Sequence, residues 1–232
     1  MKNFEMRILA VKCLRILKKF YTYQNLSERL GFSSTEMSRY INFKVIPSEK
    51  NAKKILDFFN TFINIEELIK KSITVDKNGF INNLNLLYNL DMLKLISIKA
   101  VELYKDEKID KILTAAVDGI PLATVMASLL NVDIVYAKKS RELGVNEFIE
   151  EVFIPRDSSI ISYYIPKGSI KVGERILLVD DILRTGDTQR VLLNLVYRAR
   201  AKPIGIFVIV AIGNEWERVF KDRIPVKYLA KL

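Results

Sequence analysis

The sequence contains no histidine and only one cysteine, and both shortages narrow the chemistry open to the protein. A lone Cys13 cannot form an intramolecular disulfide. Without histidine, the common zinc-finger ligand sets and the Ser-His-Asp and Cys-His catalytic arrangements are excluded. Any chemistry the chain performs must therefore use carboxylates, hydroxyls, amines and backbone amides.

A long apolar run is also missing. No uninterrupted apolar stretch reaches the roughly 18 to 20 residues that cross a bilayer, and the first residues, MKNFEMRILAVK, lack the pattern of a secretory signal. We therefore expect a cytoplasmic protein with no membrane partner. Half of the 232 residues are apolar, so the chain can bury a substantial core in one large domain or two modest ones.

Positive charge is concentrated near the amino terminus. Residues 1–72 hold 14 Lys and Arg against 7 Asp and Glu, a net charge of +7, whereas the other 160 residues hold 23 against 20, a net charge of +3. A general lysine bias is one explanation of this excess. The other is a localised basic surface, which is typical of proteins that bind nucleic acid.

The basic segment has the spacing of a helix-turn-helix motif. Apolar residues recur at helical intervals over residues 6–20, and the two helices that follow meet at Gly31, which tolerates the conformation of a tight turn. Ser27 offers a small side chain where the two helices cross. Met37 and Tyr40 provide apolar anchors on the inner face of the second helix.

The second of these helices is predicted to present a polar outer face. Ser33 and Glu36 have the spacing of a capping box at its start. The short donors and the arginine of the outer face suit base edges and phosphates in a DNA major groove. The candidate DNA-binding residues are Ser34, Thr35, Ser38, Arg39, Asn42 and Lys44. The alternative is an ordinary helical hairpin with a solvated outer face.

We expect two domains joined by a short linker. Residues 1–72 are assigned to an all-α helix-turn-helix domain, and residues 73–83, with an Asn-Gly turn at 78 and 79, to the linker. In residues 84–232, short apolar segments alternate with helical patterns. This alternation predicts an α/β domain with a parallel sheet flanked by helices, in which ligands bind beyond the carboxyl ends of the strands.

The most specific motif is ILLVDDILRTGDT, at residues 176–188. A buried strand is expected to deliver Asp180 and Asp181, followed by a loop whose amides and hydroxyls surround a phosphate at the start of a helix. Adjacent carboxylates repel each other unless a ligand hydroxyl or a metal ion uses them, and they are suitable acceptors for ribose hydroxyls. Gly186 allows close approach of the backbone to the phosphate.

This motif resembles the phosphoribosyl-diphosphate signature of type I phosphoribosyltransferases. VDGIPLA at 117–123 resembles the pyrophosphate loop of that family, and YAKKS at 136–140 resembles the basic pair near the pyrophosphate. The resemblance covers residues 84–232 and implies a type I phosphoribosyltransferase fold. The ligand-binding residues that it implies are Asp118, Gly119, Lys138, Lys139, Asp180, Asp181, Ile182, Leu183, Arg184, Thr185, Gly186, Asp187 and Thr188.

The two halves together resemble archaeal GfcR-type regulators of sugar catabolism, which join a helix-turn-helix to an orotate phosphoribosyltransferase-like domain. The second half is also similar to bacterial PurR-type purine repressors. These resemblances imply a homodimeric transcription regulator that binds double-stranded promoter DNA. They further imply that its second domain senses phosphoribosyl diphosphate, or a related ribose phosphate or nucleotide, to control sugar or nucleotide metabolism genes.

Two acids depart from the pattern of the enzymes. Asp118 stands where a basic residue often precedes the glycine of the pyrophosphate loop, and Asp187 stands where a small residue or lysine is common. An acid facing a pyrophosphate lowers the affinity for that group. Either the ligand lacks a full pyrophosphate, or Mg2+ mediates. No other cofactor is expected, and the residues do not identify a set of metal ligands.

These departures favour a non-catalytic sensor with no catalytic residues. The main alternative is an active orotate or purine phosphoribosyltransferase with an autoregulatory DNA-binding head. The lack of histidine does not exclude it, because this catalysis rests on positioning and charge stabilisation. RNA attenuation is a third, less favoured hypothesis, because the head has no platform rich in stacking residues.

Residues 138–171 correspond to the mobile loop that covers the site in the enzymes. The apolar runs VFI and IISYYI within this segment predict a structured hairpin. Arg141, Arg156 and Lys167 are either ligand contacts or solvated side chains. The residues after 211 show no pattern that identifies a nucleobase pocket.

Overall fold

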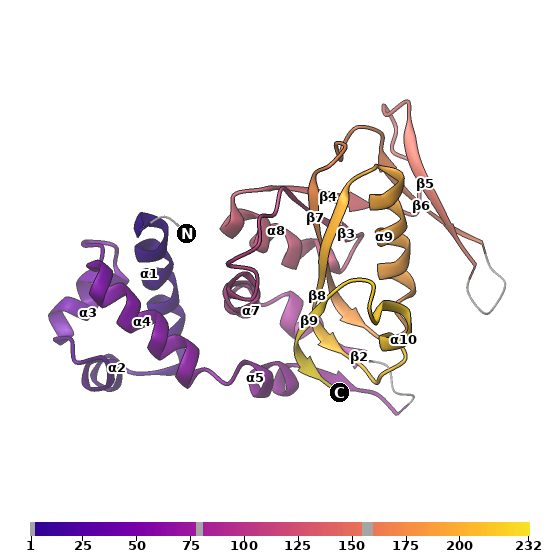
Figure 1. The fold of residues 1–232 in the computed structure, drawn as a ribbon. Coiled ribbons are helices and arrows are strands. Elements are labelled where there is room, and N and C mark those ends of the chain that lie inside the picture. The colour runs from indigo at the N-terminus through magenta and orange to yellow at the C-terminus, as the bar shows by residue number, and fades with distance from the viewer. Residues whose placement is uncertain (1–2, 78–80, 155–159) are drawn as a thin grey trace. The chain divides into compact units, whose positions relative to one another are not determined.

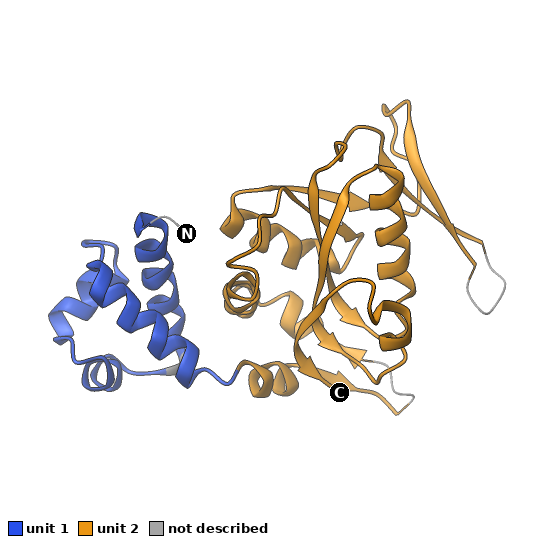
Figure 2. Cartoon of the chain, viewed as in Figure 1, with its two compact units in different colours: residues 1–64 blue, residues 65–232 orange. Residues whose placement is uncertain are grey.

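The computed structural model describes residues 3–77, 81–154 and 160–232 (Figure 1). The predicted Asn-Gly turn at 78 and 79 and the candidate Arg156 lie outside the described residues. The chain divides into two compact units, residues 1–64 and residues 65–232 (Figure 2). Among the described residues, no helix is long and apolar enough to cross a membrane.

The first unit is helical throughout its described part. Its elements are α1 (Asn3–Phe20), α2 (Tyr23–Leu30), α3 (Ser34–Ile41) and α4 (Glu49–Phe62). Helix α1 packs along α4 and also contacts α2 and α3. The hydroxyls of Thr22, Ser33 and Ser48 each accept a hydrogen bond from the amide three residues further on, so three of these helices begin at a capping side chain.

The division between the units falls before residues 73–83, where the sequence places the linker. Helix α5 (Ile65–Ser72) contacts β9 (Val226–Lys231), and Ile69 is fully buried in the core of the second unit. The short strands β1 (Thr74–Val75) and β2 (Ile81–Asn82) pair with each other in the same unit. The amphipathic pattern of α5 shows that the helix has an apolar face, but not which domain covers that face.

The second unit contains a five-stranded sheet in the order β4-β3-β7-β8-β9. All pairings within this sheet are parallel. The other four strands are β3 (Lys111–Ala115), β4 (Asp133–Ala137), β7 (Arg175–Leu183) and β8 (Lys202–Ala211). This sheet and its flanking helices confirm the α/β architecture expected from the alternating apolar segments.

Helices cover both faces of the sheet, as Figure 1 shows. Helices α7 (Leu90–Glu102) and α8 (Gly119–Leu130) lie over one face, and α9 (Asp187–Arg198) lies over the other. Successive residues of β7 alternate between the two faces. Leu177 and Val179 join the core under α7 and α8, while Ile176 and Leu178 join the core under α9. The short helices α6 (Leu84–Leu87) and α10 (Glu217–Phe220) complete the unit.

The predicted hairpin is present beside α9. Strands β5 (Phe148–Phe153) and β6 (Ile161–Pro166) pair antiparallel as a separate two-stranded sheet. Glu151 of β5 accepts hydrogen bonds from Asn194 Nδ2 at 2.8 Å and from Arg198 Nε, both on α9. The described part of residues 138–171 therefore contains a two-stranded sheet that hydrogen bonds hold against α9.

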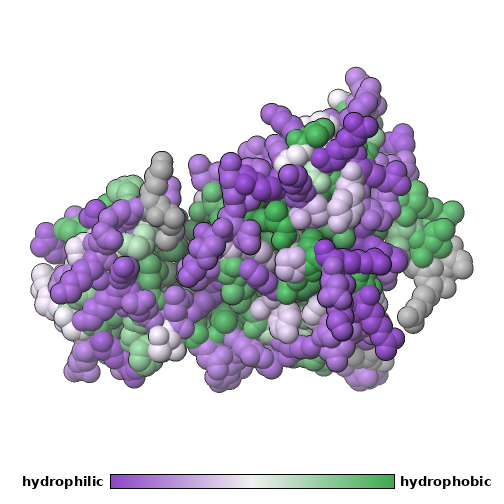
Figure 3. Space-filling view, viewed as in Figure 1, coloured by the Kyte–Doolittle hydropathy of each residue, from purple (hydrophilic) through white to green (hydrophobic). Residues whose placement is uncertain are grey.

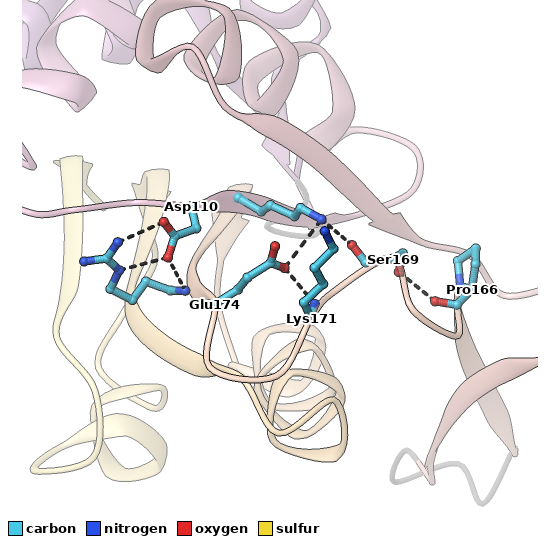
Figure 4. A network of polar contacts seen from close by, with 7 residues as sticks. Asp110, Pro166, Ser169, Lys171 and Glu174 are labelled. Carbon is cyan, nitrogen blue, oxygen red and sulfur yellow. Dashed lines mark hydrogen bonds and ion pairs between the residues drawn. The ribbon is translucent and has the colours of Figure 1, made fainter.

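A polar network joins the amino-terminal ends of β3 and β7 (Figure 4). Arg175 donates to both carboxylate oxygens of Asp110, at 2.9 Å from Nε and 2.8 Å from Nη2. These hydrogen bonds hold the pKa of Asp110 well below its usual range. Lys111 donates to the carbonyl of Ser169 at 2.8 Å and lies 3.4 Å from Glu174. The network joins the two strands at the amino-terminal edge of the sheet.

Candidate functional site

The predicted ligand residues lie in or directly beyond the carboxyl-terminal parts of three neighbouring strands. β3 leads into the segment 117–123, β4 leads into Lys138 and Lys139, and β7 carries the two aspartates of the segment 176–188. Because β4, β3 and β7 are adjacent and parallel, all three segments emerge at the same edge of the sheet. The structure therefore brings together the regions that the sequence motifs select.

The two aspartates occupy different environments. Asp180 is buried and accepts hydrogen bonds from Gln189 Nε2 at 2.7 Å and from the amide of Asp181 at 3.1 Å. Burial and the neighbouring Asp181 carboxylate raise the pKa of Asp180 well above its usual value. Asp181 is partly exposed and accepts from Asn83 Nδ2 at 2.6 Å. Asp180 is thus bound within the protein, whereas Asp181 retains exposed surface.

Sequence reasoning missed Asn83 and Gln189, the two amides that satisfy these carboxylates. Gln189 directly follows the sequence TGDT at residues 185–188. A side-chain amide in the first turn of the helix after two acids could have been predicted to donate to one of them. Asn83 precedes Asp181 by 98 positions. No local pattern connects Asn83 to the acids, because only the folded sheet brings them together.

The loop after β7 contains a glycine, Gly186, at a position where a larger residue would not fit. Gly186 has φ of 87°, and a Cβ at this position would lie 2.7 Å from Cε2 of Phe220. Only glycine therefore fits both the left-handed backbone and the space under the ring. The threonine before it, Thr185, donates from Oγ1 to Asp187 Oδ2 at 2.9 Å, and Arg190 Nη2 lies 3.3 Å from Asp187 Oδ1.

The remaining residues of this loop differ in exposure. Leu183 is fully buried in the core under α9, and Ile182 packs partly buried against the opposite core. Arg184 is exposed, and Thr188 is half-buried in the first turn of α9. Among residues 182–188, the side chains with most surface available to a ligand therefore come after β7, and the last two residues of β7 offer little.

The 117–123 segment passes close to Asp180 at its glycine. Gly119 is buried, and a Cβ there would collide with Thr114 Oγ1 and lie 2.9 Å from Asp180 Oδ1. The backbone of this segment therefore passes close to Asp180, and the peptide bond between residues 116 and 117 is cis. Asp118 is exposed at the start of α8 and makes no side-chain capping bond.

The lysine pair contacts other groups than the aspartates. Lys138 exchanges backbone hydrogen bonds with Tyr164 of the hairpin, and its ammonium lies 3.0 Å from Glu142. The ammonium of the exposed Lys139 lies 5.7 Å from the centre of the Tyr163 ring. Both lysines therefore contact the hairpin, Lys138 through its backbone and Lys139 through its side chain.

A cavity of about 630 Å³ lies beside the loop after β7. The hairpin, the loop with the first turns of α9, and the segment around α10 all contribute to its wall. The lining residues are Phe153, Ile154, Thr185, Asp187, Arg190, Asn214, Glu215, Arg218 and Val219. Neither Asp180 nor Asp181 lines this cavity.

In the first unit, α2 and α3 are joined by a tight turn. Gly31 has φ of 59° and its amide donates to the carbonyl of Ser27, which ends α2 in a left-handed cap. Ser27 Oγ also donates to the carbonyl of Phe32 in the turn. Met37 and Tyr40 are buried on the inner face of α3, as their spacing predicts.

The capping box at the start of α3 is only half formed. The Ser33 hydroxyl accepts from the amide of Glu36 at 3.1 Å, as predicted. The carboxylate of Glu36 accepts instead from Tyr40 Oη at 2.6 Å and from Asn51 Nδ2 at 3.2 Å. Burial and the hydrogen bond to Glu36 raise the pKa of Tyr40. The Glu36 carboxylate therefore bonds to these two side chains and not to the backbone amide of Ser33. Because Asn51 lies on α4, this contact links α3 to α4.

The candidate DNA-binding residues share one surface of α3 and of the turn that follows it. Ser38 is partly exposed and accepts at its backbone carbonyl from Asn42 Nδ2 at 2.9 Å. The exposed members of the set are Ser34, Thr35, Arg39, Asn42 and Lys44. The outer face of α3 is therefore polar and open, as the sequence predicts.

This arrangement of sheet, loops and aspartates defines a phosphoribosyltransferase domain. The family described as Phosphoribosyl transferase domain matches residues 83–228, which is more than half of the chain. The chain therefore belongs to the phosphoribosyltransferase family.

Relatives include both enzymes and regulators. The chain is 29% identical over 154 residues to a xanthine phosphoribosyltransferase of Alkaliphilus metalliredigens, covering 64% of this chain and 76% of the relative. It is 27% identical over 170 residues to the probable purine biosynthesis transcriptional regulator PurR of Streptococcus pneumoniae, covering 72% of this chain and 60% of the relative. The similarity to PurR regulators identifies a domain that occurs in proteins with a regulatory role.

Solved structures agree with the fold. The adenine phosphoribosyltransferase of Thermoanaerobacter pseudethanolicus superposes with a TM-score of 0.66 at 21% sequence identity, covering 72% of this chain and 99% of that chain. The corresponding enzyme of Rhodothermus marinus gives a TM-score of 0.65 at 21% identity, covering 72% and 98%. These similarities establish the type I phosphoribosyltransferase fold.

Proposed function

We propose that this protein is a DNA-binding transcription regulator whose phosphoribosyltransferase domain senses phosphoribosyl diphosphate or a related ribose phosphate or nucleotide. One observation carries the proposal. A domain shared with PurR regulators is joined to a separate helical unit, in which two helices meet at a tight turn and present exposed donors. The genes under control belong to sugar or nucleotide metabolism, as in the GfcR-type regulators that the chain resembles.

The helical unit binds double-stranded promoter DNA. Its outer face on α3 carries hydroxyls, an amide and Arg39, which are side chains that contact base edges in a major groove. The net charge of +7 on residues 1–72 supplies attraction to the phosphates, which acts regardless of base sequence. If its source is a prokaryote, like the regulators it resembles, such a protein acts in the cytoplasm, where the DNA lies.

The second unit binds the effector at the carboxyl ends of β3, β4 and β7. Asp181 accepts from the ribose hydroxyls, while the loop at 184–188 and the start of α9 surround the phosphate. The described residues contain no group of three or more His, Cys, Asp or Glu that could hold a metal ion. If the ligand carries a full pyrophosphate, Mg2+ comes with that ligand, which supplies most of its coordination.

Coupling between the two units requires a dimer. Helix-turn-helix heads bind two half-sites, so a homodimer formed through the second unit sets the spacing of the heads. The ligand changes DNA binding only if its affinity differs between the two poses of the heads. Effector binding and operator binding therefore influence each other through the equilibrium between the two poses of the heads.

Fluorescence anisotropy with the protein's own promoter tests this proposal. At fixed salt concentration, the labelled promoter is titrated with protein in the presence of phosphoribosyl diphosphate, ribose 5-phosphate or nucleotides, each with and without Mg2+. We expect promoter-specific binding that one of these ligands changes. Equal binding to promoter and scrambled DNA would overturn the proposal.

A second candidate function is transfer of the phosphoribosyl group to a nucleobase. The similarity to xanthine phosphoribosyltransferase and the retained aspartate pair favour it. Incubation with phosphoribosyl diphosphate, Mg2+ and each nucleobase distinguishes the two functions, because an enzyme releases pyrophosphate and a sensor does not. Steady release would make the head an autoregulatory addition to an enzyme.

A further inference from the structure

One acid in the proposed phosphate-binding loop is already bound by the groups that a phosphate needs. Asp187 accepts from Thr185 Oγ1 at 2.9 Å through one carboxylate oxygen. Its other oxygen lies 3.3 Å from Arg190 Nη2. A hydroxyl and a guanidinium are the donors that phosphate oxygens take in proteins. We propose that Asp187 occupies the phosphate position as an internal substitute and so determines which ligands bind; this inference rests on the proposed effector site.

The loop has little freedom to avoid this contact. Gly186, between Thr185 and Asp187, is fixed at φ of 87° under the ring of Phe220. The backbone amide of Asp187 also lies 3.4 Å from Thr185 Oγ1. Because the backbone is held on both sides, the carboxylate cannot leave the hydroxyl through a small shift of the loop. It leaves when the side chain of Asp187 or of Thr185 rotates.

The cavity beside the loop gives the carboxylate a place to go. Asp187, Thr185 and Arg190 all line this cavity of about 630 Å³, and the Asp187 side chain is 42% exposed. A phosphate that enters the loop can therefore displace Asp187 into the cavity, whose wall also includes the Arg218 side chain.

Arg190 connects this exchange to the hairpin. Its guanidinium carbon lies 5.6 Å from the centre of the Phe153 ring at the end of β5. The same side chain thus contacts the internal carboxylate and the hairpin. When a phosphate replaces the carboxylate, Arg190 gains a new partner of higher charge, and the hairpin position responds to the occupancy of the loop.

The consequence is selection by charge. A ligand must replace a carboxylate that already has two donors, so a weakly bound monophosphate gains little. A ligand with additional anchoring groups, such as ribose hydroxyls on Asp181 and a second anionic group near Lys138, overcomes the competition. Asp187 therefore lowers the affinity for every ligand that places a phosphate in the loop, and only a ligand with additional anchoring groups still binds at low concentration.

Isothermal titration calorimetry of the full chain with inorganic phosphate and ribose 5-phosphate tests the inference. We expect Asp187→Ser, which removes the carboxylate and keeps a residue that suits a helix start, to bind both probes about ten-fold more tightly than the natural protein. Asp187→Asn, which keeps the shape without the charge, should give a smaller gain. Asp222→Asn removes an equal charge from an exposed turn after α10 and should change affinity by less than about two-fold.

The outcomes separate this inference from the effector proposal. Binding of phosphoribosyl diphosphate by the natural protein, with no gain in Asp187→Ser, overturns the role of Asp187 and leaves the effector site standing. Failure of the natural protein and of both Asp187 variants to bind any of the three compounds, with unchanged thermal melting, overturns both. A gain in Asp187→Ser and in Asp222→Asn alike would show an effect of net charge and would also overturn the role of Asp187.

Discussion

Arg39 and Asp181 belong to different units, and their substitution should separate DNA binding from ligand response. Arg39 is exposed on the outer face of α3 and is the one arginine in the predicted DNA-binding set. We expect Arg39→Ala to weaken promoter binding about ten-fold or more, since a good base contact contributes about 1–3 kcal/mol. The affinity for phosphoribosyl diphosphate should stay unchanged in calorimetry. Arg218→Ala removes the same charge from the second unit and serves as the control; an equal loss in both variants would contradict a specific contact.

The converse holds for the effector site. Asp181→Asn keeps the shape of the side chain and an acceptor for Asn83, but it removes the charge that we assign to the ribose hydroxyls. We expect the ligand to lose its effect on promoter anisotropy while DNA affinity without ligand stays the same. Thr188→Val should act similarly by removing a hydroxyl from the first turn of α9. A ligand response that survives both substitutions would refute the assigned site.

Asp180 should reveal itself through the pH dependence of stability. Its pKa in the folded protein is raised by burial and by Asp181. A carboxyl group of this kind favours folding below its unfolded pKa, and that contribution is lost as the pH rises through the folded pKa. We therefore expect Asp180→Asn to melt at a higher temperature than the natural protein near neutral pH. The difference should shrink as the pH falls toward about 4. A difference in melting temperature between the two proteins that stays constant across this pH range would contradict a raised pKa at Asp180.

Among the helices and strands, the β5–β6 hairpin is the element whose attachment can be tested by itself. Glu151 links β5 to α9 through Asn194 and Arg198, and the Arg198 side chain is 58% exposed. The Glu151 side chain itself is only 12% exposed. We expect Glu151→Gln to raise amide hydrogen exchange in β5 several-fold with a small loss in melting temperature, because β5 and β6 form a sheet separate from the central one and can open locally. Glu147→Gln breaks an ion pair with Lys167 that does not reach α9, and it should leave exchange in β5 nearer to that of the natural protein. Equal exchange in the natural protein and Glu151→Gln would show that this contact does not hold the hairpin.

The apolar segments of the central strands were sufficient to predict the α/β architecture. The two apolar sequences VFI and IISYYI were sufficient to predict the hairpin. The last strand, β9, is less visible in sequence, because Lys227 and Lys231 interrupt its apolar residues at the edge of the sheet. The position of α5 in the second unit is also hidden, because its partner β9 lies more than a hundred residues later. Long-range contacts of this kind decide domain boundaries, and no local period records them.

The same reasoning applies to the site. The motif around Asp180 and Asp181 is local, so its letters indicate a phosphate loop directly. The partner amides from Asn83 and Gln189 appear only in the fold, and so does the contact between Thr185 and Asp187. Glu36 illustrates the limit in the other direction, since its local capping pattern gives way to Tyr40 and Asn51.

For the whole molecule, the uneven charge predicts a steep dependence of DNA binding on salt. Most of the formal net charge of +10 lies in the first third of the sequence. The logarithm of the promoter affinity should fall linearly with the logarithm of the salt concentration, with a slope set by the number of phosphate contacts. We expect Lys44→Ala to reduce that slope by about 1, because the exposed Lys44 follows α3 and is assigned to a phosphate. Anisotropy titrations at several salt concentrations measure it, and an unchanged slope would place Lys44 away from the DNA.

The pair formed by Asp110 and Arg175 has a consequence for how readily the protein can acquire a new specificity. These residues fasten β3 to β7 at the amino ends of the strands, whereas every loop assigned to the ligand leaves from the carboxyl ends. The residues that hold the sheet together and the residues assigned to the ligand thus lie at opposite ends of the same strands. In a randomised library selected for response to a different metabolite, accepted changes should accumulate at positions 117–119 and 184–188, while Asp110 and Arg175 should remain nearly invariant. A scaffold divided in this way can pass between catalysis and sensing without first becoming unstable.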